Sequence, residues 1–178
     1  TIKYFLKKGF QVILLSHLEQ NGKIPHFDII HKFLEKKLKT KIAFLKEPVR
    51  FANRTFEEKI ILLDNLRLNP GEKSNSKSFA KKLANLGEIF INDAFSVSHR
   101  NHASIVGIPK FLPSSLGPVF KKEIKELSKV FKPQHPFLLV VGGNKFETQE
   151  PLISRFLNKA DYIFVGGAIA NTFLENRG

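Results

Sequence analysis

Two imidazoles and a guanidinium lie within four residues near the middle of the chain, at His99, Arg100 and His102. They belong to residues 92–104, which follow a short apolar run, so a buried strand is expected to emerge into a loop there. Imidazole and guanidinium N–H groups donate charge-assisted hydrogen bonds, so the cluster could bind a small anion. Alternatively, the histidines are only hydrogen-bonded within the fold. If the segment is helical, His99 and His102 share one face.

His17 and Arg67 each follow an earlier apolar run in the same way. In open α/β sheets, ligands bind at the carboxyl ends of the strands. Both side chains are therefore expected at an edge of a sheet where ligands could bind. For Arg67 the sequence leaves an alternative open, a local ion pair with Asp64 or Glu72.

Two glycine pairs follow two later apolar runs, at Gly142 and Gly143 and at Gly166 and Gly167. Paired glycines allow the backbone to approach phosphate groups closely, and the N-terminus of a following helix favours negative charge. Lys145 would add a positive charge beside the first pair. Each pair taken alone is also compatible with an ordinary strand-to-helix turn.

These segments together resemble the phosphoglycerate kinase family. Residues 92–104 are similar to its Asn-Asp-Ala-Phe stretch followed by His-Arg-x-His-Ala-Ser, and residues 64–68 to its Glu-Asn-Leu-Arg-Phe segment. Residues 142–149 resemble its Gly-Gly-Ala-Lys-Val-Ser-Asp-Lys nucleotide loop, and residues 166–173 its Gly-Gly-Gly-Met-Ala-x-Thr-Phe adenosine segment. With the loop that contains His17, five motifs occur in the family's order.

The resemblance implies a glycolytic phosphotransferase that moves a phosphoryl group reversibly between 1,3-bisphosphoglycerate and ADP, giving 3-phosphoglycerate and ATP. It implies that Mg²⁺ arrives with ADP or ATP and that its protein ligand lies outside this chain, so no metal-binding residue is expected here. It assigns substrate binding to His17, Arg67, Arg100 and His102, and nucleotide binding to Gly142, Gly143, Lys145, Gly166 and Gly167. Arg100 and Lys145 are the implied catalytic residues.

Three positions depart from the family pattern. In the family's Ser-His-Leu-Gly-Arg-Pro-x-Gly loop, Glu19 stands here for the glycine and Gln20 for the arginine, and Gln149 replaces the second lysine of the nucleotide loop. A neutral amide cannot replace a bidentate guanidinium, and a neighbouring carboxylate is expected to repel an anion. Loss of one such donor in phosphoryl transfer costs on the order of 3–4 kcal/mol. The alternative hypothesis is a catalytically inactive homologue or fragment that keeps the fold and anion binding only.

The elements that must position these residues are strands and helices in alternation. Continuous apolar runs predict strands buried on both faces, at residues 12–15, 60–63, 89–91, 137–141 and 162–165. Amphipathic stretches predict helices between them, at residues 27–38, 79–86 and 152–157, after a first helix at residues 2–8 closed by Gly9. This rhythm predicts an α/β fold with doubly wound parallel sheets.

A proline-bracketed helix at residues 119–133 divides two such blocks. We predict an N-terminal substrate-binding lobe at residues 1–118, this inter-domain helix, and the start of a C-terminal nucleotide-binding lobe at residues 134–178. An ordinary crossover helix is the alternative. The family's Arg-x-Asp-x-Asn and late Gly-Gly-Gly-Asp motifs are not found, and the chain opens inside a helix. We therefore expect a fragment with both Rossmann-like lobes incomplete, the first lacking its first strand.

The charge balance is strongly basic, with 29 Lys and Arg against 16 Asp and Glu and a net charge of +13. A lysine-rich solvated surface, a basic cleft for an anionic metabolite and a nucleic-acid surface all fit. The lysines are dispersed and no nucleic-acid-binding motif accompanies them, which favours the first two. The absence of cysteine excludes disulfides. No apolar run could span a bilayer, so we expect a cytoplasmic monomer without membrane or nucleic-acid partners.

Overall fold

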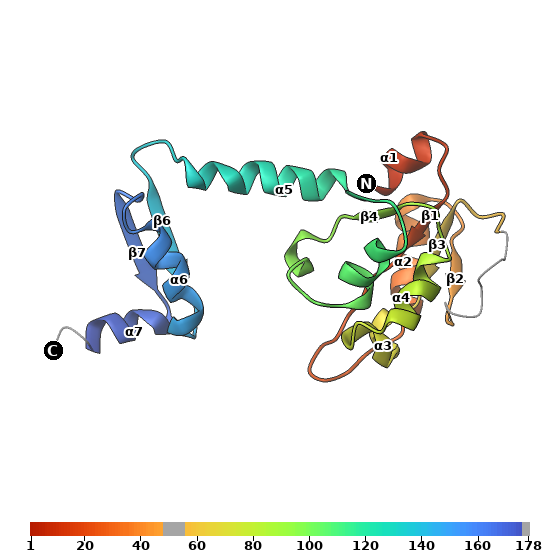
Figure 1. Ribbon diagram of the computed structural model, residues 1–178, viewed down its shortest axis with the longest axis horizontal. Coiled ribbons are helices and arrows are strands. Elements are labelled where there is room, and N and C mark those ends of the chain that lie inside the picture. The colour runs from red at the N-terminus through yellow and green to blue at the C-terminus, as the bar shows by residue number, and fades with distance from the viewer. Residues whose placement is uncertain (48–55, 176–178) are drawn as a thin grey trace. The chain divides into compact units, whose positions relative to one another are not determined.

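The computed structural model describes residues 1–47 and 56–175 (Figure 1). The described chain forms two compact units, Thr1–Ile124 (unit 1) and the residues from Lys125 onward (unit 2). Their division falls within helix α5 (Pro118–Ser128). In the part of the chain that the structure describes, no helix has the length and apolar character needed to cross a membrane.

A three-stranded parallel sheet forms the centre of unit 1. Its strands are β1 (Val12–Leu14), β2 (Ala43–Leu45) and β3 (Ile60–Leu63), in the order β1-β3-β2. Both outer strands run parallel to β3. Sequence analysis predicted β1 and β3 but missed β2, which lies in a short apolar run between Lys41 and Lys46.

Helices cover both faces of this sheet. On one face Ile61 and Leu63 pack in a core with residues of α4 (Lys77–Ala84). On the other face Ile60 and Leu62 pack with α1 (Ile2–Lys7) and α2 (Asp28–Leu38). All four side chains of β3 are at most 2% exposed, and full burial of each stabilises the fold by roughly 1.5–3 kcal/mol. The predicted doubly wound α/β architecture is thereby confirmed for unit 1.

A second parallel pair in unit 1 joins β4 (Phe90–Asn92) to β5 (Ser114–Leu116). The connection between them contains a π-helical turn, Ala103–Gly107, which packs against α4. Residues 99–102 precede this turn and are not helical, so the condition for a shared helical face of His99 and His102 is not met. Sequence analysis also missed β5, because its residues are exposed and mostly polar.

The Asn-Asp pair of residues 92–93 shapes the chain around β4. Asn92 Oδ1 accepts a hydrogen bond from Ala94 N at 3.0 Å, which turns the chain after the strand. Asp93 Oδ1 accepts one from Phe120 N at 2.9 Å and so satisfies a free amide at the start of α5. A Cβ atom at Gly117 would collide with the Asp93 carboxylate, so only glycine allows this approach.

After the end of α5 and a 3-10 turn at Lys129–Phe131, the described part of unit 2 contains one parallel strand pair and two further helices. Strands β6 (Leu138–Gly142) and β7 (Tyr162–Gly166) pair over their full length. Helices α6 (Phe146–Phe156) and α7 (Ala168–Glu175) each follow one of them, and their Ile153 and Ile169 form a core with Val141. Helix α6 begins before the predicted residues 152–157 and includes Pro151.

Candidate functional site

An open pocket of about 510 Å³ lies in unit 1 and is called here the basic pocket. Three separate segments form it: the loop after β1, the turn and short helix after β3, and the loop after β4. Its lining residues are His17, Leu18, Glu19, Asn21, Gly22, Arg67, Lys73 and Arg100. The structure thus brings His17, Arg67 and Arg100 together at the carboxyl ends of strands.

The fourth predicted residue, His102, lies directly beside this group. Its ring meets that of His17 edge-on, with 6.1 Å between the centroids, and its side chain is 15% exposed. His99, in contrast, is exposed and is not a lining residue. Only one of the two histidines of the His-Arg-x-His segment therefore belongs to the cluster.

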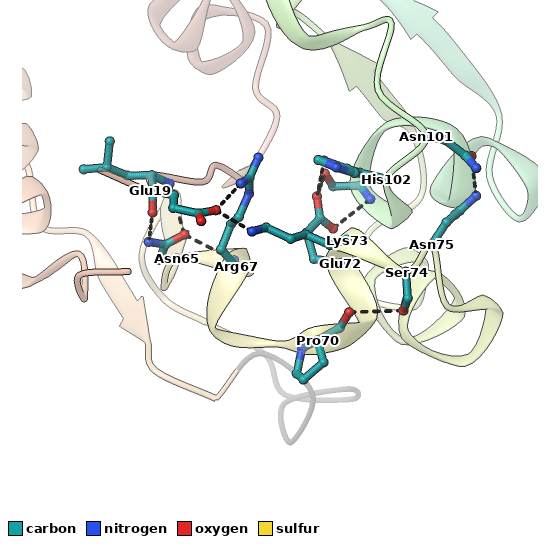
Figure 2. A network of polar contacts seen from close by, with 12 residues as sticks. Glu19, Asn65, Arg67, Pro70, Glu72, Lys73, Ser74, Asn75, Asn101 and His102 are labelled. Carbon is teal, nitrogen blue, oxygen red and sulfur yellow. Dashed lines mark hydrogen bonds and ion pairs between the residues drawn. The ribbon is translucent and has the colours of Figure 1, made fainter. Parts of the chain in front are cut away.

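Arg67 is almost buried in the pocket wall, with an exposed fraction of 8%. Its guanidinium forms an ion pair with the Glu19 carboxylate, and Lys73 Nζ lies 2.6 Å from the same oxygen, Glu19 Oε2 (Figure 2). Sequence analysis expected Glu19 only to repel an anion. The structure instead makes it the partner of two pocket cations.

The alternative of a local pair between Arg67 and Asp64 or Glu72 is wrong, because each carboxylate has another function. Asp64 lies 2.5 Å from His26 Nδ1 and accepts a hydrogen bond from Phe27 N at 2.7 Å, at the start of α2.

Glu72 is fully buried and holds the His102 segment in place. It belongs to the short helix α3 (Pro70–Lys73), and it accepts hydrogen bonds from Ser104 N at 3.0 Å and from Ser104 Oγ at 2.5 Å. Its neighbour Lys73 points to the pocket instead (Figure 2). One turn of helix thus anchors the loop after β4 and supplies a pocket cation.

Asn65 connects the loop that contains His17 to the turn that contains Arg67. Its side chain donates to Leu18 O at 2.6 Å and to Pro25 O at 2.8 Å, and it accepts from Leu18 N at 3.1 Å and from Arg67 N at 3.2 Å (Figure 2). Because the side chain is 2% exposed, these bonds are shielded from water. Asn65 therefore fixes the separation of two pocket segments.

Gln20, which replaces the family's arginine, lies in a tight turn beside the pocket. Its backbone exchanges two hydrogen bonds with Lys23, at 3.0 and 2.9 Å, across Asn21 and Gly22. Both of these residues have positive φ angles, 51° and 74°, as such hairpin turns require. Gln20 is exposed and is not a lining residue, so it does not substitute for the missing cation.

The charges of the basic pocket shift its titratable groups. Burial lowers the pKa of His17, and the charges of Arg67, Arg100 and His102 lower it further, while Glu19 opposes them. Burial also lowers the pKa of His102, against the opposing charge of Glu72. Hydrogen bonds from Lys73 and Arg67 lower the pKa of Glu19. The pocket at neutral pH therefore combines permanent cations with neutral imidazoles and an ionised carboxylate.

Two polar atoms of this cluster are buried without a hydrogen-bond partner in the described chain, Arg67 Nε and His102 Nδ1. The nearest carboxylate oxygen to the latter, Glu72 Oε1, is 3.9 Å away, beyond hydrogen-bond length. Buried polar atoms without partners are uncommon in proteins. The cluster therefore has unused hydrogen-bonding capacity as well as positive charge.

In unit 2 the two glycine pairs come into direct contact. Gly167 has a φ of +69°, and a Cβ atom there would lie 3.2 Å from Gly143 O. Ile169 N donates to the same oxygen at 3.3 Å. Lys145 immediately precedes α6 and is exposed, and the Gln149 side chain lies over Gly143. Backbone close to solvent and two helix N-termini characterise these loops.

The arrangement in unit 1 is suited to binding a small anion through charge and hydrogen bonds. That in unit 2 is suited to the approach of phosphate groups to backbone. The described residues contain no group of three or more His, Cys, Asp or Glu that could hold a metal ion. The fold and these loops are those of an α/β protein with parallel sheets and candidate anion sites at the strand ends.

Comparison with known proteins identifies the family. The family model for phosphoglycerate kinase matches residues 1–178, so the chain belongs to the phosphoglycerate kinase family. The chain is 40% identical to the phosphoglycerate kinase of Orientia tsutsugamushi (strain Ikeda), with 98% of this chain and 45% of the relative covered. It is also 40% identical to that of Fervidobacterium nodosum, with 100% of this chain and 47% of the relative covered.

Solved structures agree with this assignment. Phosphoglycerate kinase from Coxiella burnetii matches with a TM-score of 0.83 and 34% identity, over 99% of this chain and 47% of that one. The enzyme from Pyrococcus horikoshii OT3 matches with a TM-score of 0.85 at 24% identity, over 99% of this chain and 48% of that one, which supports the fold alone. The chain thus spans about half the length of the relatives it matches.

Sequence analysis did not find Asn65, Glu72 and Lys73 as residues of the site. Asn65 and Lys73 lie within or next to a motif that it did use, but their partners are 47 and 54 positions away, at Leu18 and Glu19. Long-range polar contacts of this kind leave no periodic signal in a sequence.

Proposed function

We propose that the protein containing this chain is a phosphoglycerate kinase, which transfers a phosphoryl group reversibly between 1,3-bisphosphoglycerate and ADP and yields 3-phosphoglycerate and ATP in glycolysis. The observation that carries the proposal is the convergence of His17, Arg67 and Arg100 on one pocket, with His102 beside them, in a member of this family. These residues come from three distant segments. A solvated surface needs no such convergence.

In the proposed mechanism unit 1 binds the glycerate substrate. Arg67 and Arg100 bind its carboxylate or phosphate oxygens, and His17 and His102 donate further hydrogen bonds. The unpartnered Arg67 Nε and His102 Nδ1 are available to such a ligand. Arg100 also stabilises charge on the acyl phosphate in the transition state, which makes it catalytic.

Unit 2 supplies the nucleotide loops in this mechanism. Gly142, Gly143, Gly166 and Gly167 let ADP or ATP approach the backbone, and the contact between Gly143 and Gly167 fits a ligand that needs bare main chain. Lys145 neutralises charge on the transferred group. Mg²⁺ carried by the nucleotide would supply further neutralisation of phosphate charge.

The reaction needs no covalent enzyme intermediate. The bond between the acyl oxygen and phosphorus breaks, an ADP oxygen bonds to that phosphorus, and the carboxylate of 3-phosphoglycerate leaves. Positioning and charge neutralisation therefore account for catalysis. We propose that residues 1–118 and 134–178 belong to two lobes joined by a helix at 119–133, and that lobe closure excludes water. We further propose a cytoplasmic monomer.

A coupled assay on the full-length protein tests this function. It follows ATP formation from 1,3-bisphosphoglycerate and ADP in the unmodified protein, in Gln20→Arg and in Gln149→Lys. Turnover in the unmodified protein supports the proposal and means that both glutamines are tolerated. No turnover, with activity restored by the reversions, would instead support the alternative of a homologue that has lost its chemistry and keeps the fold and anion binding.

A further inference from the structure

The Glu19 side chain places a negative charge among the cations of the basic pocket. Its Oε2 lies 2.6 Å from Lys73 Nζ and accepts a hydrogen bond from Arg67 Nη1 (Figure 2). Both cations lie on the segment after β3, whereas Glu19 lies on the loop after β1. The carboxylate therefore bridges two of the three segments that form the pocket.

Arg67 depends on this carboxylate in the described structure. Its side chain is 8% exposed, and a guanidinium so far from water needs an anionic partner. Asp64 and Glu72 are engaged by His26 and by Ser104, so neither serves it. An anionic ligand that binds to Arg67 Nη1 must therefore displace Glu19.

We propose that Glu19 is an internal competitor that a ligand's carboxylate or phosphate displaces from Arg67 and Lys73, so that residue 19 sets the affinity of the basic pocket for its anionic ligand. The identity of the ligand as phosphoglycerate rests on the proposed function, but the competition itself does not. Once Glu19 is displaced, Lys73 becomes a ligand-binding cation, a role that none of the sequence motifs assigned to it.

The side chain can leave without unfolding its surroundings. Glu19 is 27% exposed and precedes the exposed turn at Gln20, so rotation toward water breaks only its two ion pairs. If the occluded arrangement holds about nine tenths of the molecules, the apparent affinity for an anion is reduced about tenfold. A neutral amide at residue 19 cannot compete with the ligand for Arg67 and Lys73. The apparent affinity for an anion should then return to its full value.

Isothermal titration of the full-length protein tests the competition with two probes, 3-phosphoglycerate and inorganic phosphate. The variants are Glu19→Gln and the matched control Glu88→Gln, which removes an exposed charge in unit 1 outside the pocket. We expect both probes to bind Glu19→Gln about tenfold more tightly than the unmodified protein. Glu88→Gln should match the unmodified protein. Circular dichroism melts verify that both variants are folded.

Affinity for both probes that is equal or weaker in Glu19→Gln would overturn the proposal, because the carboxylate would then only hold Arg67 in position. Failure of both probes to bind either protein would overturn it as well. Tighter phosphate binding without any phosphoglycerate binding would support the competition and contradict the proposed function. If the full-length protein turns over phosphoglycerate but Glu19→Gln leaves the affinity for both probes unchanged, the proposed function is supported and the competition is contradicted.

A second variant tests the role of Lys73. In the Glu19→Gln background, Lys73→Met should weaken phosphate binding, because the freed ammonium is expected to contact the ligand. The same substitution in the unmodified protein should have a smaller effect, since it also removes a partner of the competitor. Equal effects in the two backgrounds would show that Lys73 and Glu19 act independently, and would overturn this part of the proposal.

Discussion

The two units present their candidate sites by different means. In unit 1 the site is made of charged side chains, and buried polar contacts of Asn65 and Glu72 hold the segments that present them. In unit 2 it is made of backbone, with Gly143 and Gly167 in contact and Lys145 exposed at the start of α6. The first site depends on which side chains meet, and the second on the absence of side chains.

Two departures from the family pattern, Gln20 in unit 1 and Gln149 in unit 2, lie near these two different kinds of site. Gln20 lies in an exposed turn outside the lining of the basic pocket, where Arg67, Arg100 and Lys73 still supply positive charge. Gln149 lies directly over Gly143, where Lys145 is the cation of the loop motif. We therefore expect Gln149 to weaken phosphoryl transfer more than Gln20 weakens substrate binding.

The largest expected effect comes from the buried support of unit 1. Glu72→Ala removes the acceptor of two hydrogen bonds from Ser104 and leaves a buried N–H and hydroxyl unpaired. We expect it to lower the free energy of unfolding by about 3 kcal/mol. Urea unfolding of the full-length protein measures this. Glu88→Ala on the surface should leave stability nearly unchanged. If the alanine variant does not fold, Glu72→Gln should show a smaller loss, and no loss in either variant would contradict this support.

The next effect concerns ligand binding in unit 1. Arg67→Met removes a nearly buried guanidinium from the basic pocket. We expect 3-phosphoglycerate to bind roughly thirtyfold more weakly, a loss of about 2 kcal/mol, while ADP binding stays the same. Calorimetric titration with each ligand separates the two. Lys82→Met, on an exposed position of α4, is the control. Equal losses of affinity for 3-phosphoglycerate and ADP would contradict the assignment of the two ligands to different units.

A smaller effect is expected in the backbone site of unit 2. Gly167→Ala places a side chain at a φ of +69° and a Cβ atom 3.2 Å from Gly143 O. The left-handed conformation costs about 1–2 kcal/mol for a non-glycine residue. ADP affinity and stability should both fall, and phosphoglycerate binding should not. Gly87→Ala, where a Cβ atom meets nothing within 4 Å, is the matched control. A loss of phosphoglycerate binding in Gly167→Ala would contradict the account.

The smallest effect is a pH dependence in unit 1. Burial, together with the charges of Arg67 and Arg100, lowers the pKa of His17 below its usual value of 6.5. The folded protein then binds this proton less readily than the unfolded chain, so stability falls as the pH drops below about 6.5 toward the lowered pKa. Above that range His17 is neutral in both states and contributes nothing to this dependence.

NMR titration of the imidazole protons measures this directly. The midpoint for His17 should lie below 6.5 in the free protein. It should rise when inorganic phosphate is added, because a bound anion favours the imidazolium. His17→Asn should reduce the loss of stability on acidification. A midpoint that phosphate does not move would place the anion away from this histidine.

Much of the fold could be predicted from the sequence, because β1, β3, β6 and β7 are continuous apolar runs. Strand β5 could not, since its exposed and mostly polar residues carry no apolar signal, and β2 was overlooked in a short apolar run between two lysines. The candidate site was partly predictable, because His17, Arg67 and Arg100 each follow a strand.

The pairing of Glu19 with Arg67 and Lys73 was not predictable. It joins residues 48 and 54 positions apart, and charge alone indicated repulsion of an anion at residue 19. The non-helical path of residues 99–102 likewise follows from long-range packing, because Glu72 on α3 fixes Ser104 and with it the approach of His102. Such contacts depend on tertiary structure, which local sequence patterns do not describe.

Hydrogen exchange of the full-length protein, read by mass spectrometry with one ligand at a time, tests the division of function most directly. We predict that 3-phosphoglycerate protects residues 16–22, 65–73 and 98–104, and that Mg-ADP protects residues 142–149 and 166–173. Phosphoglycerate that protects none of the three segments of unit 1, or protects the glycine loops instead, would contradict the assignment of the basic pocket as the substrate site.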